Sequence, residues 1–230
     1  MRMKKMIILL LFCCSAVSAM AQTAEELVQQ VRDRLEKVKD YEAKGKLKTN
    51  VTFIKAPVAS IRVYFKNPDK LKIINESGIS FIPKGSVNIN LNSVLARGTG
   101  YDILDGGTDK ATGWRVIKLL PADEKSDIVL STLYIDESQQ VIRKAKNTTR
   151  ESGTYELDME YGRYAEWGLP DKVVFTFNTR EYKLPKGVTF DYDGGKKKPA
   201  EDKLKNQKGK VEISYSSYTI NKGVDDGVFN

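Results

Sequence analysis

The sequence contains no histidine, and its two cysteines both lie within the first fourteen residues. Its one long apolar run, from Met6 to Cys14, follows three basic residues and precedes small ones, which is typical of a secretory signal peptide. The run is too short to span a bilayer. Ala19-Met20-Ala21 has the small-x-small pattern of a cleavage site. Residues 1–21 are therefore predicted to be removed, and Gln22 to begin the exported chain.

Cleavage there would leave residues 22–230 with neither a thiol nor an imidazole. This excludes Ser-His-Asp and Cys-His nucleophiles, disulfides, haem held by histidine and the usual zinc sites. No other set of side chains supplies a nucleophile, a base and an orienting group, so we expect no enzyme activity, no metal and no cofactor. The net charge of +8 includes three basic residues of the signal, and the remainder is not concentrated on one helix, so nucleic-acid binding is not expected.

Lipidation of Cys14 is the alternative fate of the N-terminus, and it would anchor the protein to a membrane. A lipoprotein signal has a small residue just before the modified cysteine, whereas Cys13 occupies that place here. Cleavage after Ala21 is the favoured interpretation.

One helix is predicted at the start of the exported chain. Thr23 and Glu26 have the spacing of a capping box. Apolar residues then recur at helical spacing at Leu27, Val31, Leu35 and Val38. The stripe is narrow, so only one side of this helix is expected to pack against the rest of the protein.

From Tyr41 the period changes to two, and apolar residues keep one phase as far as Leu91, with turns between the strands. A shared apolar face is typical of an antiparallel meander. Further strands are predicted at 114–120, 128–135, 141–147, 154–161, 172–177 and 211–220. Residues 92–96 are predicted to form a short helix and 105–109 a loop. A second loop is predicted at 193–210, which holds seven lysines; it is interpreted as solvated, with contact to anionic lipid or an acidic partner as the alternative.

Two polar motifs have competing interpretations. Asp102, Asp105 and Asp109 flank a glycine pair, but they lack the spacing and the final glutamate of a calcium loop, so a turn is favoured. Asn50 and Asn147 begin glycosylation sequons, although both fall in predicted strands.

Four stretches, in order, cover nearly all of the predicted exported chain. They are Arg34 to Val38 with Tyr41 and Ala43; Val63 to Leu71; Trp114 to Pro121 with Leu133 to Asp136 and Val141-Ile142; and Phe175 to Phe177 with Pro185 to Asp191. Together, behind a signal peptide, they resemble the LolA family of periplasmic lipoprotein-sorting carriers.

The resemblance implies a mainly β fold, an incomplete antiparallel β-barrel covered by the N-terminal helix and a short lid helix, as a single domain over 22–230. The predicted strands number about ten to eleven. It further implies a monomer in the periplasm, with an apolar cavity for the acyl chains of lipoproteins. Such a carrier takes its cargo from an inner-membrane donor and passes it to an outer-membrane acceptor.

The residues expected to line the cavity are those of the shared apolar face. They are Leu47, Val51, Phe53, Ile61, Val63, Phe65, Ile73, Phe81, Ile89 and Leu91. The alternative is an ordinary core, and volume separates the two, because a carrier leaves a pocket of roughly several hundred Å³. Leu27, Val31, Leu35 and Val38 are expected to pack the helix as a lid.

The turn before Pro68 departs from the family pattern. An arginine in that position helps to hold the lid closed in the family, whereas this chain has Asn67, with Lys66 before it. Neither side chain offers a planar guanidinium, so the closed state is expected to be latched less strongly. A second functional hypothesis keeps the fold but not the transport: a sensor or interaction module that detects hydrophobic ligands in the cell envelope.

Overall fold

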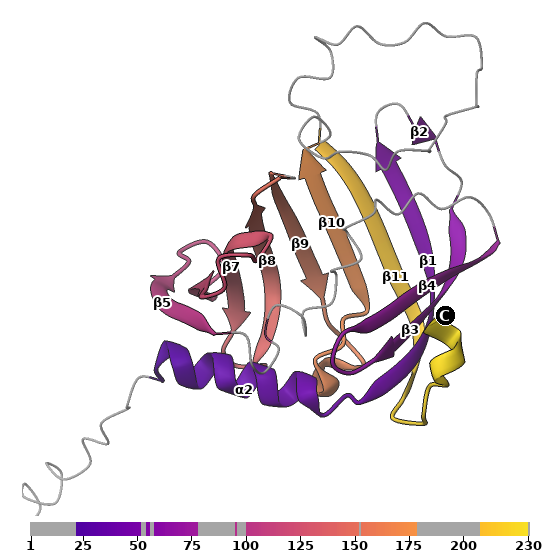
Figure 1. Ribbon diagram of the computed structural model, residues 1–230, viewed down its shortest axis with the longest axis horizontal. Helices are drawn as coiled ribbons and strands as arrows, with labels where there is room; N and C mark the ends of the chain where they lie inside the picture. The colour runs from indigo at the N-terminus through magenta and orange to yellow at the C-terminus, as the bar shows by residue number, and fades with distance from the viewer. Residues whose placement is uncertain are drawn as a thin grey trace, which may run out of the picture.

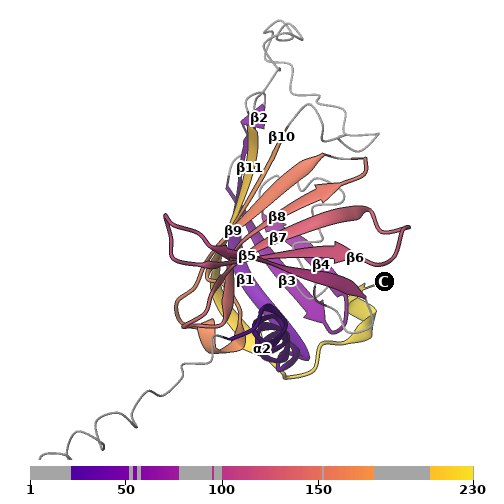
Figure 2. The ribbon, with the colours of Figure 1, turned by 90° about the vertical axis from the view of Figure 1, so that its left-hand side faces the viewer.

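An antiparallel sheet curved around one helix makes up most of the computed structural model (Figure 1). The structure describes residues 22–51, 54–55, 58–77, 95, 100–151, 153–178 and 208–229. Seen from the side, the strands bend around α2, which lies inside the curve at one end of the sheet (Figure 2). The concave face of the sheet is therefore the face that the helix partly covers.

The eleven described strands belong to one sheet, in the order β4-β3-β1-β11-β10-β9-β8-β7-β6-β5, with β2 paired to β1. Their bounds are β1 Asp40–Val51, β2 Ile54–Lys55, β3 Ala59–Lys66, β4 Lys70–Ser77, β5 Tyr101–Thr108, β6 Arg115–Pro121, β7 Ile128–Asp136, β8 Val141–Thr149, β9 Thr154–Glu160, β10 Lys172–Asn178 and β11 Lys208–Ile220. Each pairing is antiparallel, and β4 and β5 do not pair with each other. The sheet is thus an open barrel, which confirms the predicted fold class.

Alternation along each strand separates the two faces of the sheet. In β3 the buried residues Ala59, Ile61, Val63 and Phe65 alternate with half-buried ones. Val63 lies opposite Ala43 of β1 and Ile73 of β4, so the apolar residues of neighbouring strands meet on the same side. Most of the buried apolar side chains form one cluster between this face and α2.

Helix α2, Ala24–Glu36, begins as the sequence predicts. Thr23 Oγ1 accepts a 3.1 Å hydrogen bond from the Glu26 N–H, and a Glu26 carboxylate oxygen accepts one of 3.1 Å from the Thr23 N–H. The buried residues of the helix, Ala24, Leu27, Val28, Val31 and Leu35, form its sheet-facing side. None of the described helices is both long and apolar enough to cross a membrane.

Two predicted boundaries need correction, and a third prediction lies almost wholly outside the described residues. Residues 105–109 are not all loop, because β5 continues to Thr108 as an edge strand. The lysine-rich stretch does not extend to residue 210 as a loop, because β11 begins at Lys208, where it pairs with Asn178. Of the predicted helix at 92–96, only Leu95 lies within the described residues, and it is helical and buried.

Candidate ligand pocket on the concave face

A pocket of about 60 Å³ lies between the C-terminal half of α2 and the concave face of β1, β3, β4, β9, β10 and β11. Its lining is almost entirely apolar or aromatic. The lining residues are Leu35, Val38, Tyr41, Val63, Leu71, Ile73, Met159, Gly168, Leu169, Pro170, Val173, Tyr215 and Tyr218. The pocket therefore brings two predicted cavity residues, Val63 and Ile73, together with two residues predicted to pack the helix, Leu35 and Val38.

Three tyrosines form one wall of this pocket. The Tyr41 and Tyr218 ring centroids are 5.3 Å apart, and those of Tyr215 and Tyr218 are 5.0 Å apart. Burial raises the pKa of all three phenols, with a smaller contribution from neighbouring tyrosines at Tyr41 and Tyr218. Tyr218 donates a 2.7 Å hydrogen bond to the Pro170 carbonyl. The wall thus stays uncharged at neutral pH and suits an apolar ligand.

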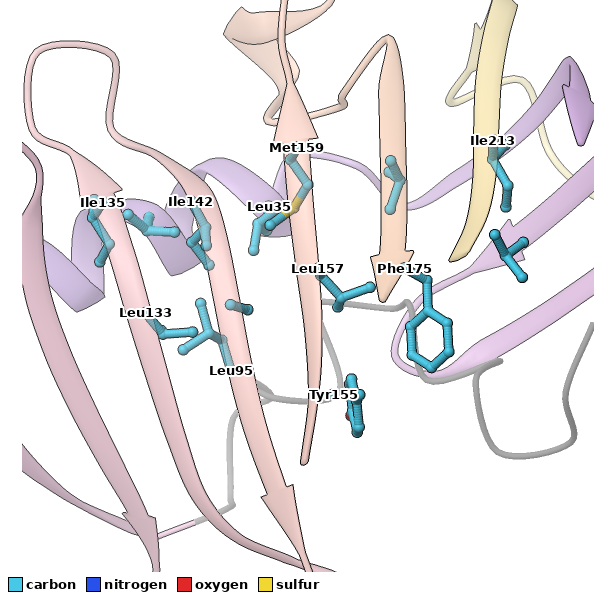
Figure 3. Packing of buried hydrophobic residues seen from close by; sticks show 14 of the residues in the cluster. Leu35, Leu95, Leu133, Ile135, Ile142, Tyr155, Leu157, Met159, Phe175 and Ile213 are labelled. Carbon is cyan, nitrogen blue, oxygen red and sulfur yellow. The ribbon is translucent and has the colours of Figure 1, made fainter. Parts of the chain in front are cut away.

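The floor continues away from the pocket along the middle of the sheet. Figure 3 shows Leu133, Leu157 and Phe175, from three different strands, which belong to the same buried cluster as Leu35 of the helix. Met159 and Leu35 meet at the pocket itself. Because this surface is continuous with the pocket, opening the cover would extend the apolar site along the sheet.

Polar contacts hold α2 against the sheet at its C-terminal half. Arg34 Nη1 donates to the Ala165 carbonyl at 3.1 Å, and Arg34 Nη2 donates to Gln140 Oε1 at 2.9 Å. Ala165 belongs to the short 3₁₀ helix η3, Ala165–Trp167, which ends at Gly168 with φ of 67°. A Cβ at Gly168 would lie 3.1 Å from Leu35 Cδ2, so glycine both permits this turn and allows the helix to approach closely.

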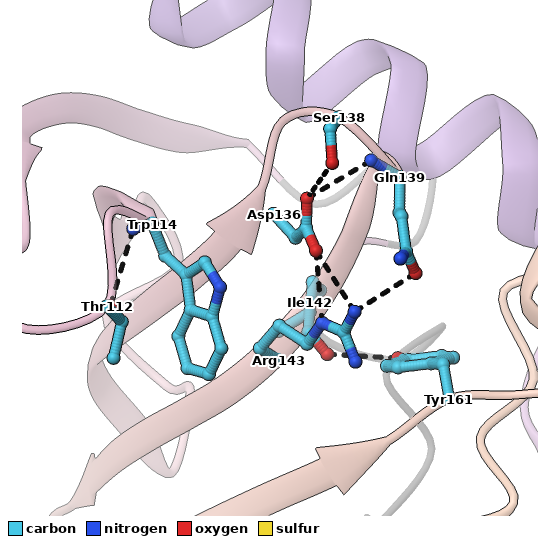
Figure 4. Close-up of polar contacts among 8 residues, drawn as sticks. All are labelled: Thr112, Trp114, Asp136, Ser138, Gln139, Ile142, Arg143 and Tyr161. Carbon is cyan, nitrogen blue, oxygen red and sulfur yellow. Dashed lines mark hydrogen bonds and ion pairs between the residues drawn. The ribbon is translucent and has the colours of Figure 1, made fainter.

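The β7–β8 turn that receives Arg34 is itself well ordered by hydrogen bonds (Figure 4). Asp136 accepts a 2.6 Å bond from the Ser138 hydroxyl and a 3.0 Å bond from Arg143 Nη2. Burial opposes ionisation of Asp136, but these bonds outweigh it and lower the pKa of the carboxyl. Tyr161 donates to the Ile142 carbonyl at 2.9 Å. The turn therefore holds Gln140 in position to accept the hydrogen bond from Arg34.

The remaining predicted cavity residues fall into separate groups. Leu47 and Ile61 are buried in the large cluster with Val63, whereas Phe65 belongs to a smaller one with Val38 and Leu169. The predictions for Phe53, Phe81, Ile89 and Leu91, and for the side chain of Val51, fall outside the described residues. On the helix, Leu27, Val31, Leu35 and the following Val38 are all buried.

The predicted latch positions contact the C-terminal segment. Lys66 Nζ lies 2.7 Å from a carboxylate oxygen of Asp226, and Lys70 Nζ lies 2.8 Å from the other. Asp226 begins the 3₁₀ helix η5, Asp226–Phe229. The Asn67 backbone N–H donates to the Lys39 carbonyl at 2.8 Å, at the junction of α2 and β1. These contacts fix the β3–β4 turn to the α2–β1 junction and to the C-terminal segment.

Two buried polar residues on the concave face were not predicted as functional. Ser131 of β7 and Asn147 of β8 are fully buried, and their polar side-chain atoms have no hydrogen-bond partner in the described part of the chain. The sequence does hold a signal: both residues occupy the inward phase of a strand, where apolar residues are expected. Asn147 attracts notice in the sequence only as part of a sequon.

At the other end of α2, an open groove of about 480 Å³ lies beside Glu25 and the edge strand β5. Asp105 of β5 and Asp109 of the following loop are engaged locally. Asp105 accepts a 2.8 Å bond from the Gly107 N–H and pairs with Arg115, and Asp109 bonds Thr112. Within the described ranges no group of acidic side chains is arranged to hold a metal ion.

The sequence matches no protein-family model and no curated protein. Its structure is similar to several solved ones, including the three described next. A domain named for outer membrane lipoprotein sorting, from Vibrio parahaemolyticus, has a TM-score of 0.59 at 12% identity, covering 90% of this chain and 97% of that one. A LolA superfamily protein from Nitrosomonas europaea has a TM-score of 0.58 at 10% identity, covering 91% of this chain and 98% of that one. A DUF1329 family protein from Desulfovibrio piger has a TM-score of 0.55 at 12% identity, also covering 91% of this chain and 98% of that one. The resemblance predicted from the sequence is thus confirmed for the fold: this chain adopts the fold of LolA superfamily proteins.

Proposed function

We propose that this protein is a periplasmic carrier that binds the acyl chains of lipoproteins between α2 and the concave face of its sheet. The observation that carries the proposal is the pocket beneath α2, whose walls are apolar side chains and neutral tyrosines. The fold shared with a lipoprotein-sorting domain and a LolA superfamily protein supports it. In this role the cargo comes from the inner membrane and is delivered toward the outer membrane.

The size of the pocket requires the cover to open. About 60 Å³ is far less than the roughly 300–1,000 Å³ of a typical ligand site, so by volume the closed structure matches the ordinary core and not the open cavity expected of a carrier. A bound acyl chain must therefore displace part of the packing between α2 and the sheet. Burying about 14 methylenes at about 0.8 kcal/mol each would yield roughly 11 kcal/mol, enough to offset such a displacement. The same packing, when it closes again, would help to expel the chain.

Helix α2 is well suited to be the moving cover. It lies on the sheet with one apolar side, and its described ties to the β7–β8 turn and η3 are a few hydrogen bonds from Arg34 and Gln30. A few hydrogen bonds of about 1 kcal/mol each can break and re-form while the fold persists.

The experiment tests whether the protein delivers an acyl ligand to a membrane, and not only whether it binds one. The exported protein, purified without detergent, is analysed by mass spectrometry for copurified lipid, then loaded with a fluorescent acylated peptide and mixed with acceptor vesicles. A carrier binds the acylated peptide and transfers it, and it ignores the same peptide without the acyl chain. Binding without transfer would instead favour a sensor, and failure to bind would exclude both roles.

A further inference from the structure

Ser131 and Asn147 lie directly opposite each other in the register of β7 and β8, on the concave face. The same transverse row continues through Leu119 of β6 on one side and Tyr155 of β9 on the other. The exposed fraction is 1% for Ser131 and 0% for Asn147. An amide and a hydroxyl therefore share the floor of a mainly apolar surface.

Both side chains have unused hydrogen-bonding capacity. Ser131 Oγ and the Nδ2 and Oδ1 atoms of Asn147 have no partner among the described residues. Burying an unpaired amide is unfavourable, and folded proteins pair most of their buried polar groups. Retaining two such groups on facing positions is therefore a cost in the empty protein that a polar ligand group would remove.

The chemistry of the pair selects for an acceptor. Asn147 offers two N–H donors and Ser131 one O–H donor, and a single bond between the two residues uses only one of them. At least two donors then remain. Leu133 and Ala145, the next facing pair along the same strands, are apolar, so these two neighbours supply no positive charge for an anion. A neutral carbonyl oxygen, which accepts two hydrogen bonds, fits this site.

We propose that Ser131 and Asn147 bind the carbonyl of an acyl ligand, at the ester or amide that links its chain to the rest of the molecule. The inference rests on the proposed function, because the pair is fully buried in the closed protein and a carbonyl reaches it only when an entering chain displaces the packing over this part of the sheet. Asn147 and Ser131 each donate to the carbonyl, since neither side chain bonds the other in the structure. The apolar face then binds the chain, and the polar pair fixes how far it enters.

The test compares three ligands that differ only at the linking group. They are the methyl ester and the N-methyl amide of one long fatty acid, and the alkane with the same number of heavy atoms, each measured by displacement of an apolar dye from the whole exported protein. We expect the ester and the amide to bind roughly tenfold more tightly than the alkane. A difference between ester and amide then shows which linkage is preferred.

Two variants and a control connect this preference to the pair. Asn147→Leu replaces the amide by an apolar group of similar size and should abolish the preference for a carbonyl, while the empty protein becomes as stable or more stable. Ser131→Ala should reduce the preference while leaving the fold intact. Leu133→Met, a volume-conserving change on the same face, should affect all three ligands equally.

The outcomes separate this inference from the proposed function. If all three ligands bind the unaltered protein equally, the carbonyl site is overturned, and a buried water is the remaining partner for Ser131 and Asn147. Acyl binding by the protein would still stand. Strong destabilisation by Asn147→Leu would also overturn it, because the amide would then be part of the structure. If no ligand displaces the dye, the carrier function and the carbonyl site both fail.

Discussion

Arg34 Nη2 donates a 2.9 Å hydrogen bond to Oε1 of Gln140, a residue 106 positions away on the β7–β8 turn. The same guanidinium reaches the Ala165 carbonyl with Nη1. One side chain thus connects the covering helix to the β7–β8 turn and to η3, at the end of the helix that lies over the pocket. This makes Arg34 the most direct point at which to loosen the cover without altering the pocket walls.

Arg34→Met should weaken the attachment of α2 while keeping its apolar packing. Loss of two hydrogen bonds is expected to lower the free energy of unfolding by about 1–3 kcal/mol and to increase apolar-dye binding by the folded protein. Urea unfolding and dye fluorescence measure the two effects. Lys37→Met, at an exposed position just after the helix, is the matched control and should change neither.

Leu35→Ala tests whether α2 acts as a cover by removing part of its packing against the sheet. The side chain is 8% exposed and lines the pocket, so its truncation should cost about 2–5 kcal/mol and enlarge the pocket. Dye binding to the folded protein should rise. If the variant instead unfolds with no folded, dye-binding state, α2 is an element of the core and the carrier loses its moving part.

Charge on the concave face should be far more damaging than charge on the convex face. Val63→Glu places a carboxylate at a position that is 1% exposed, which should destabilise the protein by roughly 3–5 kcal/mol and abolish acyl-peptide binding. Lys46→Glu, on the solvated face of the adjacent strand, should do neither. Equal effects from both variants would mean that the apolar and solvated faces are assigned the wrong way round.

The tie between the β3–β4 turn and the C-terminal segment should respond to acid. Hydrogen bonds from Lys66 and Lys70 lower the pKa of Asp226 to about 2. Because this value is below the ordinary one, the tie is fully present above about pH 4 and is lost as the pH falls toward 2. A carboxyl NMR titration should give the low value in the unaltered protein and a value near 4 after Lys66→Met with Lys70→Met. An unchanged titration would show that the lysines do not set it.

The sequence predicts the strands whose inward residues are mainly apolar. Ala59 to Phe65 shows the alternation of a half-buried strand, and β3 forms there. Strand β5 escapes prediction because it is an edge strand with mostly exposed side chains, including two glycines, so it lacks that alternation.

The site is less predictable than the sheet, for a physical reason. Val63 and Phe65 share one phase of one strand, yet they belong to different clusters, because the division depends on where α2 and η3 cross the face. The partners of Arg34 are likewise more than one hundred positions away. Periodicity reveals which side of a strand is inward, whereas the boundaries of a pocket depend on long-range packing.

The pairing of β1 with β11 has a consequence for biogenesis. Tyr41 of β1 lies opposite Ile220 of β11, and both strands are interior strands of the sheet. A chain made N-terminus first therefore leaves one edge of β1 unpaired until β11 has been added, and one edge of β10 is unpaired for the same time. The sheet can be completed only after the last described strand is available, which exposes the unfinished chain to aggregation and makes it a natural client for a holding chaperone.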